Sequence, residues 1–212
     1  MVDIHVQHVT YEDIVFKPSD EQIQADCHQP YAGHENGCAN YGTTYGCPPH
    51  APKLAEFKEI LAAYTHFYLV YGEVELAGDP KQDKAIYATM QEHVDAFVNF
   101  MQDSIPDLFI IHGYGCHYCE RVGVGKCTCP KKPCRHPGKR TYSLSVALDI
   151  VSTMNSAGIS MEMNPARGTK VFRRIGFVAS KLPVDIDERV KEFELDVPEQ
   201  PATGGSRGKK SK

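Results

Sequence analysis

The placement of cysteine is the feature that most constrains this chain. Eight cysteines occur among 212 residues, and they fall into two groups separated by 68 residues that contain none. Five of them lie within residues 116–134, and the other three lie within residues 27–47. Secreted disulfide scaffolds typically exceed about 8–10% cysteine, and disulfide pairing gives no reason for five cysteines to crowd together. The pattern favours thiols that bind a metal.

The remaining composition is that of an ordinary globular protein, with 42% hydrophobic and 24% charged residues. No apolar run approaches the roughly 20 residues of a membrane-spanning helix, and the first residues do not resemble a signal peptide. We therefore expect a cytoplasmic protein with no membrane partner, in a reducing compartment where thiols stay free or bind metal. The net charge of −4 argues against specific binding to nucleic acid.

The fold class follows from three consecutive segments. Residues 66–71 and 107–111 are apolar runs of the kind found in strands that are buried on both faces. Between them, the apolar residues of 79–103 recur at steps of three and four, which predicts a long helix. The sequence thus predicts a βαβ unit within a small sheet, in an α/β fold that also carries long cysteine-rich loops.

The other elements are predicted from local patterns. They are a strand or hairpin within residues 2–17, a helix that starts at Ser19, helices over 52–63 and 143–156, and one or two strands within 171–178. We expect a single metal-binding domain over residues 1–196. Residues 197–212 are rich in Pro, Gly, Ser and Lys, which predicts a disordered basic tail.

The cysteine-rich segment predicts an iron–sulfur cluster. Cys116 and Cys119 form a Cys-x-x-Cys pair, which places two thiolates on one tight turn, and Cys127, Cys129 and Cys134 follow at uneven spacings beside prolines. Zinc sites tend to combine two Cys-x-x-Cys pairs, or one pair with histidines, whereas single cysteines next to proline are more typical of iron–sulfur ligation. We expect a four-iron (4Fe-4S) cluster, with zinc as the alternative metal.

The charge of this segment fits an anionic metal centre. Residues 121–140 include seven basic residues and no acidic one. Cations near thiolates offset their charge and lower the thiol pKa. Arg135, which follows Cys134 directly, is the residue that we expect to interact with the centre.

The amino-terminal cysteines lie in a glycine-rich segment, residues 27–51, that reads as a long loop. Two arrangements remain open for Cys27, Cys38 and Cys47. They could hold a second metal, with a fourth ligand from Cys129 or from a histidine such as His28, His34 or His50, or they could fold over the first cluster. A site with only three cysteines would leave one iron open to a substrate.

Both cysteine segments resemble a known family. The motif Gly115-Cys116-x-x-Cys119, followed by Cys127-Thr-Cys-Pro, Pro133-Cys134-Arg-His-Pro137 and Arg140-x-x-Ser143, is similar to the closing motif of the domain-of-unknown-function 2284 family of predicted metal-binding proteins. The segment Cys38-x-x-Tyr-Gly-x-x-x-Gly-Cys47-Pro-Pro resembles its amino-terminal motif. The resemblance implies a cysteine-ligated metal, most plausibly iron–sulfur, in proteins frequent among anaerobes. It implies the ligands Cys116, Cys119, Cys134 and either Cys127 or Cys129, of which alignment on Pro133-Cys134-Arg135 favours Cys127.

These observations lead to three functional hypotheses. The first is electron transfer, or redox service to a partner enzyme. The second is a cluster-dependent enzyme that acts on a small molecule through an open iron, which predicts a pocket near Cys38 and Cys47. The third is a structural zinc protein. No hydrolase triad or catalytic carboxylate pair is evident in the sequence.

Overall fold

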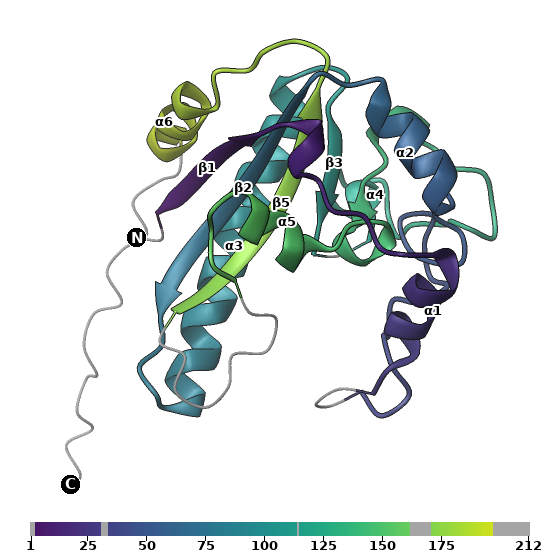
Figure 1. The fold of residues 1–212 in the computed structure, drawn as a ribbon, viewed down its shortest axis with the longest axis horizontal. Helices are drawn as coiled ribbons and strands as arrows, with labels where there is room; N and C mark the ends of the chain where they lie inside the picture. The colour runs from purple at the N-terminus through teal and green to yellow at the C-terminus, as the bar shows by residue number, and fades with distance from the viewer. Residues whose placement is uncertain (1–2, 31–33, 114, 162–170, 197–212) are drawn as a thin grey trace, which may run out of the picture.

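A five-stranded mixed sheet forms the centre of the protein (Figure 1). The computed structural model describes residues 3–30, 34–113, 115–161 and 171–196. The strand order is β1-β2-β5-β3-β4, with bounds Ile4–Val9 for β1, His66–Glu75 for β2, Phe109–His112 for β3, Tyr142–Ser143 for β4 and Val171–Ser180 for β5. The α/β class predicted from the sequence is confirmed.

The predicted βαβ unit is present, with another strand between its two strands. Both β2 and β3 pair antiparallel with β5, so they run parallel to each other on either side of it. Helix α3 (Pro80–Ser104) connects them. Its start follows from the sequence, because the Asp79 side chain accepts hydrogen bonds from the backbone N–H groups of Lys81 and Gln82 at 3.0 and 2.9 Å.

Helices cover both faces of the sheet (Figure 1). Helices α2 (Leu54–Ala62) and α5 (Ile150–Ser156) pack on one face, and α3 and α6 (Ile186–Asp196) pack on the other. Because side chains alternate along a strand, Leu69 of β2 enters the first layer and its neighbour Val70 enters the second. The central strands are therefore buried on both faces, as their apolar sequences predict.

The predicted helix over 143–156 is partly wrong. Ser143 belongs to β4, and Leu144–Val146 form a short 3₁₀ turn. Helix α5 begins at Ile150 because the Asp149 side chain accepts a hydrogen bond from the Ser152 N–H at 3.1 Å. Leu148 cannot join the helix, since it pairs with Phe16 in an isolated β-bridge.

Other differences are smaller. Helix α1 (Asp20–His28) follows the Ser19 cap as predicted, with Ser19 Oγ accepting from the Gln22 N–H at 3.2 Å. Helix α2 begins at Leu54, two residues later than predicted, and α6 was not predicted. Residue 2 and the predicted tail, 197–212, lie outside the described residues. Within the described part of the chain, no helix has both the length and the apolar character to cross a membrane.

Phe57 is the side chain through which α2 joins the core, and its replacement tests this packing. It is fully buried and contacts the rings of Phe109 and Tyr142 edge to face, at centroid distances of 5.4 and 5.5 Å. We expect Phe57→Ala to lower the free energy of unfolding by about 3–5 kcal/mol, measured by urea denaturation. The control Leu195→Ala, at a side chain that is 88% exposed, should stay within about 0.5 kcal/mol of the parent protein. Equal losses in both variants would contradict this account of the core.

Candidate metal centre

The two cysteine-rich segments meet at the β4 edge of the sheet. The glycine-rich segment passes beside β4, where the Gly46 carbonyl accepts a hydrogen bond from the Ser143 N–H at 2.9 Å. The Gly46 Cα lies so close to the second segment that an added Cβ would collide with the Thr141 carbonyl oxygen and would lie 2.9 Å from the Cys116 nitrogen. Tyr45 also spans the contact, with its hydroxyl 3.4 Å from the Pro130 carbonyl oxygen. Segments that are distant in sequence thereby bring their cysteines together.

Thiols of the second segment influence one another's pKa values. Burial, as the largest cause, and the adjacent thiols of Cys127 and Cys134 together raise the pKa of Cys129 to about 12. Burial also raises the pKa of Cys119, and the Cys127 thiol contributes to this increase. We call Cys119, Cys127, Cys129 and Cys134 the carboxyl-side thiol group. Ionising such a group is unfavourable unless a cation offsets the charge, and a metal ion does this most strongly.

The three amino-terminal cysteines form a second group. Burial, as the largest cause, and the thiols of Cys38 and Cys47 together raise the pKa of Cys27 to about 11. The backbone holds two of them together, because the Cys38 N–H donates to the Cys27 carbonyl at 2.7 Å. We call Cys27, Cys38 and Cys47 the amino-side thiol group.

Cys116 lies between the two groups. Its thiol raises the pKa of Cys47 on one side and that of Cys119 on the other, in each case as a smaller contribution than burial. Of the ligands expected from the sequence, Cys116 and Cys127 both contribute to the pKa of Cys119, while Cys127 and Cys134 contribute to that of Cys129. Which of these thiols would share a metal stays a prediction.

Arg135 reaches the segment between Cys119 and Cys127. Its guanidinium donates to the carbonyl oxygens of Val124 and Lys126, both at 2.6 Å, and to that of Gly125 at 3.4 Å. The same cation opposes the burial effect on the pKa of Cys119. Arg135 therefore fixes the backbone that leads into Cys127, a role that its position beside Cys134 did not reveal.

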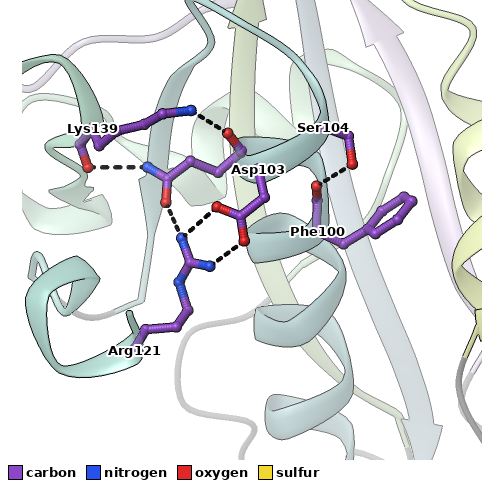
Figure 2. A network of polar contacts seen from close by, with 6 residues as sticks. Phe100, Asp103, Ser104, Arg121 and Lys139 are labelled. Atoms are coloured by element: carbon purple, nitrogen blue, oxygen red, sulfur yellow. Dashed lines mark hydrogen bonds and ion pairs between the residues drawn. The ribbon is translucent and has the colours of Figure 1, made fainter. Parts of the chain in front are cut away.

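Helix α3 anchors both ends of the cysteine-rich segment (Figure 2). Arg121, at the end of the short helix α4 (Tyr118–Arg121), forms an ion pair with Asp103 and donates to Gln102 Oε1 at 2.7 Å. Gln102 Nε2 in turn donates to the Lys139 carbonyl at 3.1 Å, and Lys139 Nζ donates to the Gln102 carbonyl at 2.7 Å. The thiols are therefore carried by a loop that is tied to a rigid helix.

A cavity of about 280 Å³ lies beside the Cys116–Cys119 turn, at the end of β3. His112 lines it and is only 7% exposed; its Nε2 lies 3.3 Å from Thr141 Oγ1, and its Nδ1 has no hydrogen-bond partner among the described residues. Asp95 also lines the cavity and forms an ion pair with Arg174 at 3.1 Å. A much smaller cavity, about 60 Å³, lies beside Pro48 and Pro49.

Sequence reasoning missed these cavity residues, although signals for them existed. His112 is the last residue of the buried strand β3 and Gly113 follows it, which is where sites gather in α/β sheets. Gly113 lies directly against the Arg174 guanidinium, which a Cβ at this position would displace. Asp95 adjoins the apolar stripe of α3, where a charged residue calls for a partner.

The gathered thiols fit a metal by their donor chemistry, since thiolate is the ligand preferred by zinc and by iron–sulfur iron. Among the described residues, however, no group of three or more His, Cys, Asp or Glu side chains already has the geometry of a metal site. The fold and the thiol groups define a cysteine-rich α/β protein with the donor set of a metal-binding protein.

The chain belongs to the family described as predicted metal-binding protein (DUF2284), whose model matches residues 18–178. The match includes all eight cysteines. It also confirms the family resemblance read from the two cysteine motifs. No curated protein and no solved structure matches the chain significantly.

The burial of His112 predicts a dependence of stability on pH. Burial, as the largest cause, and the nearby Arg174 and Arg121 guanidinium groups together lower the pKa of His112 from 6.5 to about 4. As the pH falls from 6.5 to 4, the unfolded chain takes up a proton that the folded chain refuses, so the free energy of unfolding decreases. The shift corresponds to about 3 kcal/mol.

The variant His112→Gln removes the titrating group and should show a correspondingly shallower loss of stability over this range. Urea denaturation at several pH values measures the difference between the two slopes. Identical slopes for the variant and the parent protein would show that His112 is not held neutral by burial.

Proposed function

We propose that this protein holds a four-iron, four-sulfur cluster on the carboxyl-side thiol group and serves in electron transfer. The observation that carries the proposal is that Cys119, Cys127, Cys129 and Cys134 lie on one loop that is fastened to α3, in a chain of a predicted metal-binding family. Their uneven spacing and the neighbouring prolines favour iron–sulfur over zinc. The proposed ligands differ from the set expected from the sequence in one member, with Cys129 in the place of Cys116.

The surroundings of the loop support a redox role. When bound, an iron–sulfur cluster supplies one-electron chemistry, whose potential depends on hydrogen bonds, nearby charge and exposure. Arg135 supplies positive charge beside Cys119, and Arg140 lies next to Cys134, with its guanidinium 4.9 Å from the centre of the Tyr45 ring. Both cations favour the extra negative charge of a reduced centre.

A redox partner protein is the binding partner that this surface suits. Lys126, Lys131 and Lys132 are exposed around the thiol group, and a cluster of exposed cations attracts an acidic surface and speeds its association. A reducing, anaerobic cytoplasm is the setting in which such a centre would persist.

A cluster-dependent enzyme is the second candidate, because a cavity large enough for a small molecule adjoins the Cys116–Cys119 turn. The cavity beside Pro48 and Pro49, which directly follow Cys47, is much smaller than the one at this turn. His112 and Thr141 would provide hydrogen bonds to a polar ligand there.

Metal analysis tests the proposed cofactor. Protein purified anaerobically should be brown and contain equal amounts of iron and acid-labile sulfide, with an electron paramagnetic resonance signal after reduction. Cys134→Ser should lose most of the iron held by the carboxyl-side thiol group. A colourless protein with stoichiometric zinc, purified under the same conditions, would exclude the iron–sulfur proposal and favour a structural zinc site.

Arg135 should matter for retention of the metal. Arg135→Ala removes three hydrogen bonds to the backbone that precedes Cys127, so we expect iron to be lost to a chelator several-fold faster. Lys132→Ala, at an exposed cation of the same loop, is the matched control. Equal rates of iron loss in the two variants would show that the Arg135 hydrogen bonds do not help to retain the metal.

A further inference from the structure

We propose that the cavity at the end of β3 is a binding site for a small, planar and uncharged molecule that both donates and accepts hydrogen bonds, as a carboxamide does. The proposal rests on the second candidate function for the place of the site, and it adds the class of molecule that the site holds. It does not depend on which metal the thiols bind.

Three parts of the fold enclose the cavity. Helix α3 contributes Asp95, Asn99 and Gln102, which recur at steps of four and three and therefore share one face of the helix. His112 closes the end of β3, and Thr141 immediately precedes β4. The remaining wall comes from α4 and the residue before it. The volume of about 280 Å³ lies just below the roughly 300–1,000 Å³ of most ligand pockets, so the molecule that fits is small.

Buried polar side chains line this cavity. His112, Thr141 and Gln102 are all less than one-tenth exposed, whereas positions so deeply buried are mostly apolar in proteins. The contact with His112 Nε2, at 3.3 Å, is the one hydrogen bond of the Thr141 hydroxyl among the described residues. Because a hydroxyl is one donor and two acceptors, Thr141 keeps the capacity to bind a ligand.

Asn99 supplies the hydrogen bonds that select the ligand. Its side chain is partly buried in the cavity wall, and it makes no hydrogen bond to another residue in the part of the chain that the structure describes. A carboxamide carries one acceptor oxygen and two N–H donors on a single planar group. A ligand with an amide edge of its own therefore satisfies Asn99 with two parallel hydrogen bonds, which a molecule that only donates or only accepts cannot do.

The buried charges at the cavity are already paired, and this excludes a charged ligand. Asp95 forms its ion pair with Arg174 at 3.1 Å, and Arg121 forms an ion pair with Asp103. A ligand with a full charge would either break one of these pairs or stay unpaired beside them, and both are costly where little water remains. An uncharged ligand leaves the two pairs intact.

Helix α4 gives the cavity a flat wall. The Arg121 guanidinium lies over the Tyr118 ring, 5.0 Å from its centre, and both groups are planar. A planar molecule makes more contact with such a wall than a branched aliphatic one does. Glu120 and His117, whose side chains lie 3.7 Å apart, are about half exposed at the rim, where solvent and salt screen their charge.

Three probes of nearly equal size and shape test the proposal. Benzamide, benzoate and benzamidinium are neutral, anionic and cationic at pH 7. Each is titrated into the full chain, purified anaerobically with the metal that it holds, and binding is measured by saturation-transfer NMR and by the shift in Tm. Benzamide should bind with a dissociation constant on the order of 1 mM, roughly tenfold tighter than either charged probe. A protein that does not bind benzamide, or that binds all three probes equally, would overturn the proposal.

The variant Asn99→Ala locates the site. Alanine is the best helix former, and the position is only partly buried, so the fold should persist while the affinity for benzamide falls by roughly five- to tenfold. Gln91→Ala is the matched control, since it removes an amide from a partly buried position of α3 outside the cavity, and it should bind benzamide as the parent protein does. Equal affinities in the two variants would contradict the assignment of the site.

Iron and sulfide content, measured on the same preparations, separates this proposal from the proposed function. A colourless zinc protein that binds benzamide through Asn99 would exclude the iron–sulfur centre and support the ligand site. A brown protein with the expected iron that fails the benzamide test would support the centre and overturn the ligand site.

Discussion

The thiol arrangement depends on a close contact between the two cysteine-rich segments. Gly46 of the first segment lies against the second, and Gly115 of the second lies against the first. At each position, a side chain would occupy space held by the other segment: the Thr141 carbonyl and the Cys116 nitrogen near Gly46, and the Cys47 sulfur near Gly115. Neither glycine has a positive φ, so glycine is needed at these positions because a larger side chain would not fit. Without this approach, the amino-side cysteines and Cys116 would belong to separate parts of the surface.

The loops themselves contribute little to the hydrophobic core. The two core clusters draw on the strands and on α2, α3, α5 and α6, and none of the eight cysteines belongs to either cluster. The long segments between α1 and α2 and between β3 and β4 are held by hydrogen bonds, by the tie to α3 and by close backbone approaches. In such loops, a bound metal supplies the cohesion that burial of apolar surface supplies elsewhere, and its binding energy becomes part of the folding energy.

The sequence predicts the parts of this structure that depend on local patterns. The strands at β2 and β3 and the start of α3 follow from apolar runs and from the Asp79 cap, and α6 could have been found from Ile186, Val190 and Phe193, which recur at steps of four and three. The position of β5 between β2 and β3 is a long-range pairing that no local pattern contains. The same limit applies to Cys116 and Cys129. Their spacing in sequence indicates metal-binding chemistry, but it does not show which thiols lie beside them. That depends on how two loops about 70 residues apart meet, which close contacts at glycines decide.

The cavity and the cysteine-rich loop share one supporting structure. Arg121 lines the cavity, and its guanidinium, through Asp103 and Gln102, also fastens the helix that carries Cys119 to α3. Burying the Asp95–Arg174 ion pair and a neutral His112 beside it is costly for stability. Polar groups retained at such a cost, next to the loop that carries the thiols, are better explained by a ligand of the cavity than by packing. Because that ligand would touch Arg121, its binding and the position of Cys119 would be coupled through the same ion pair.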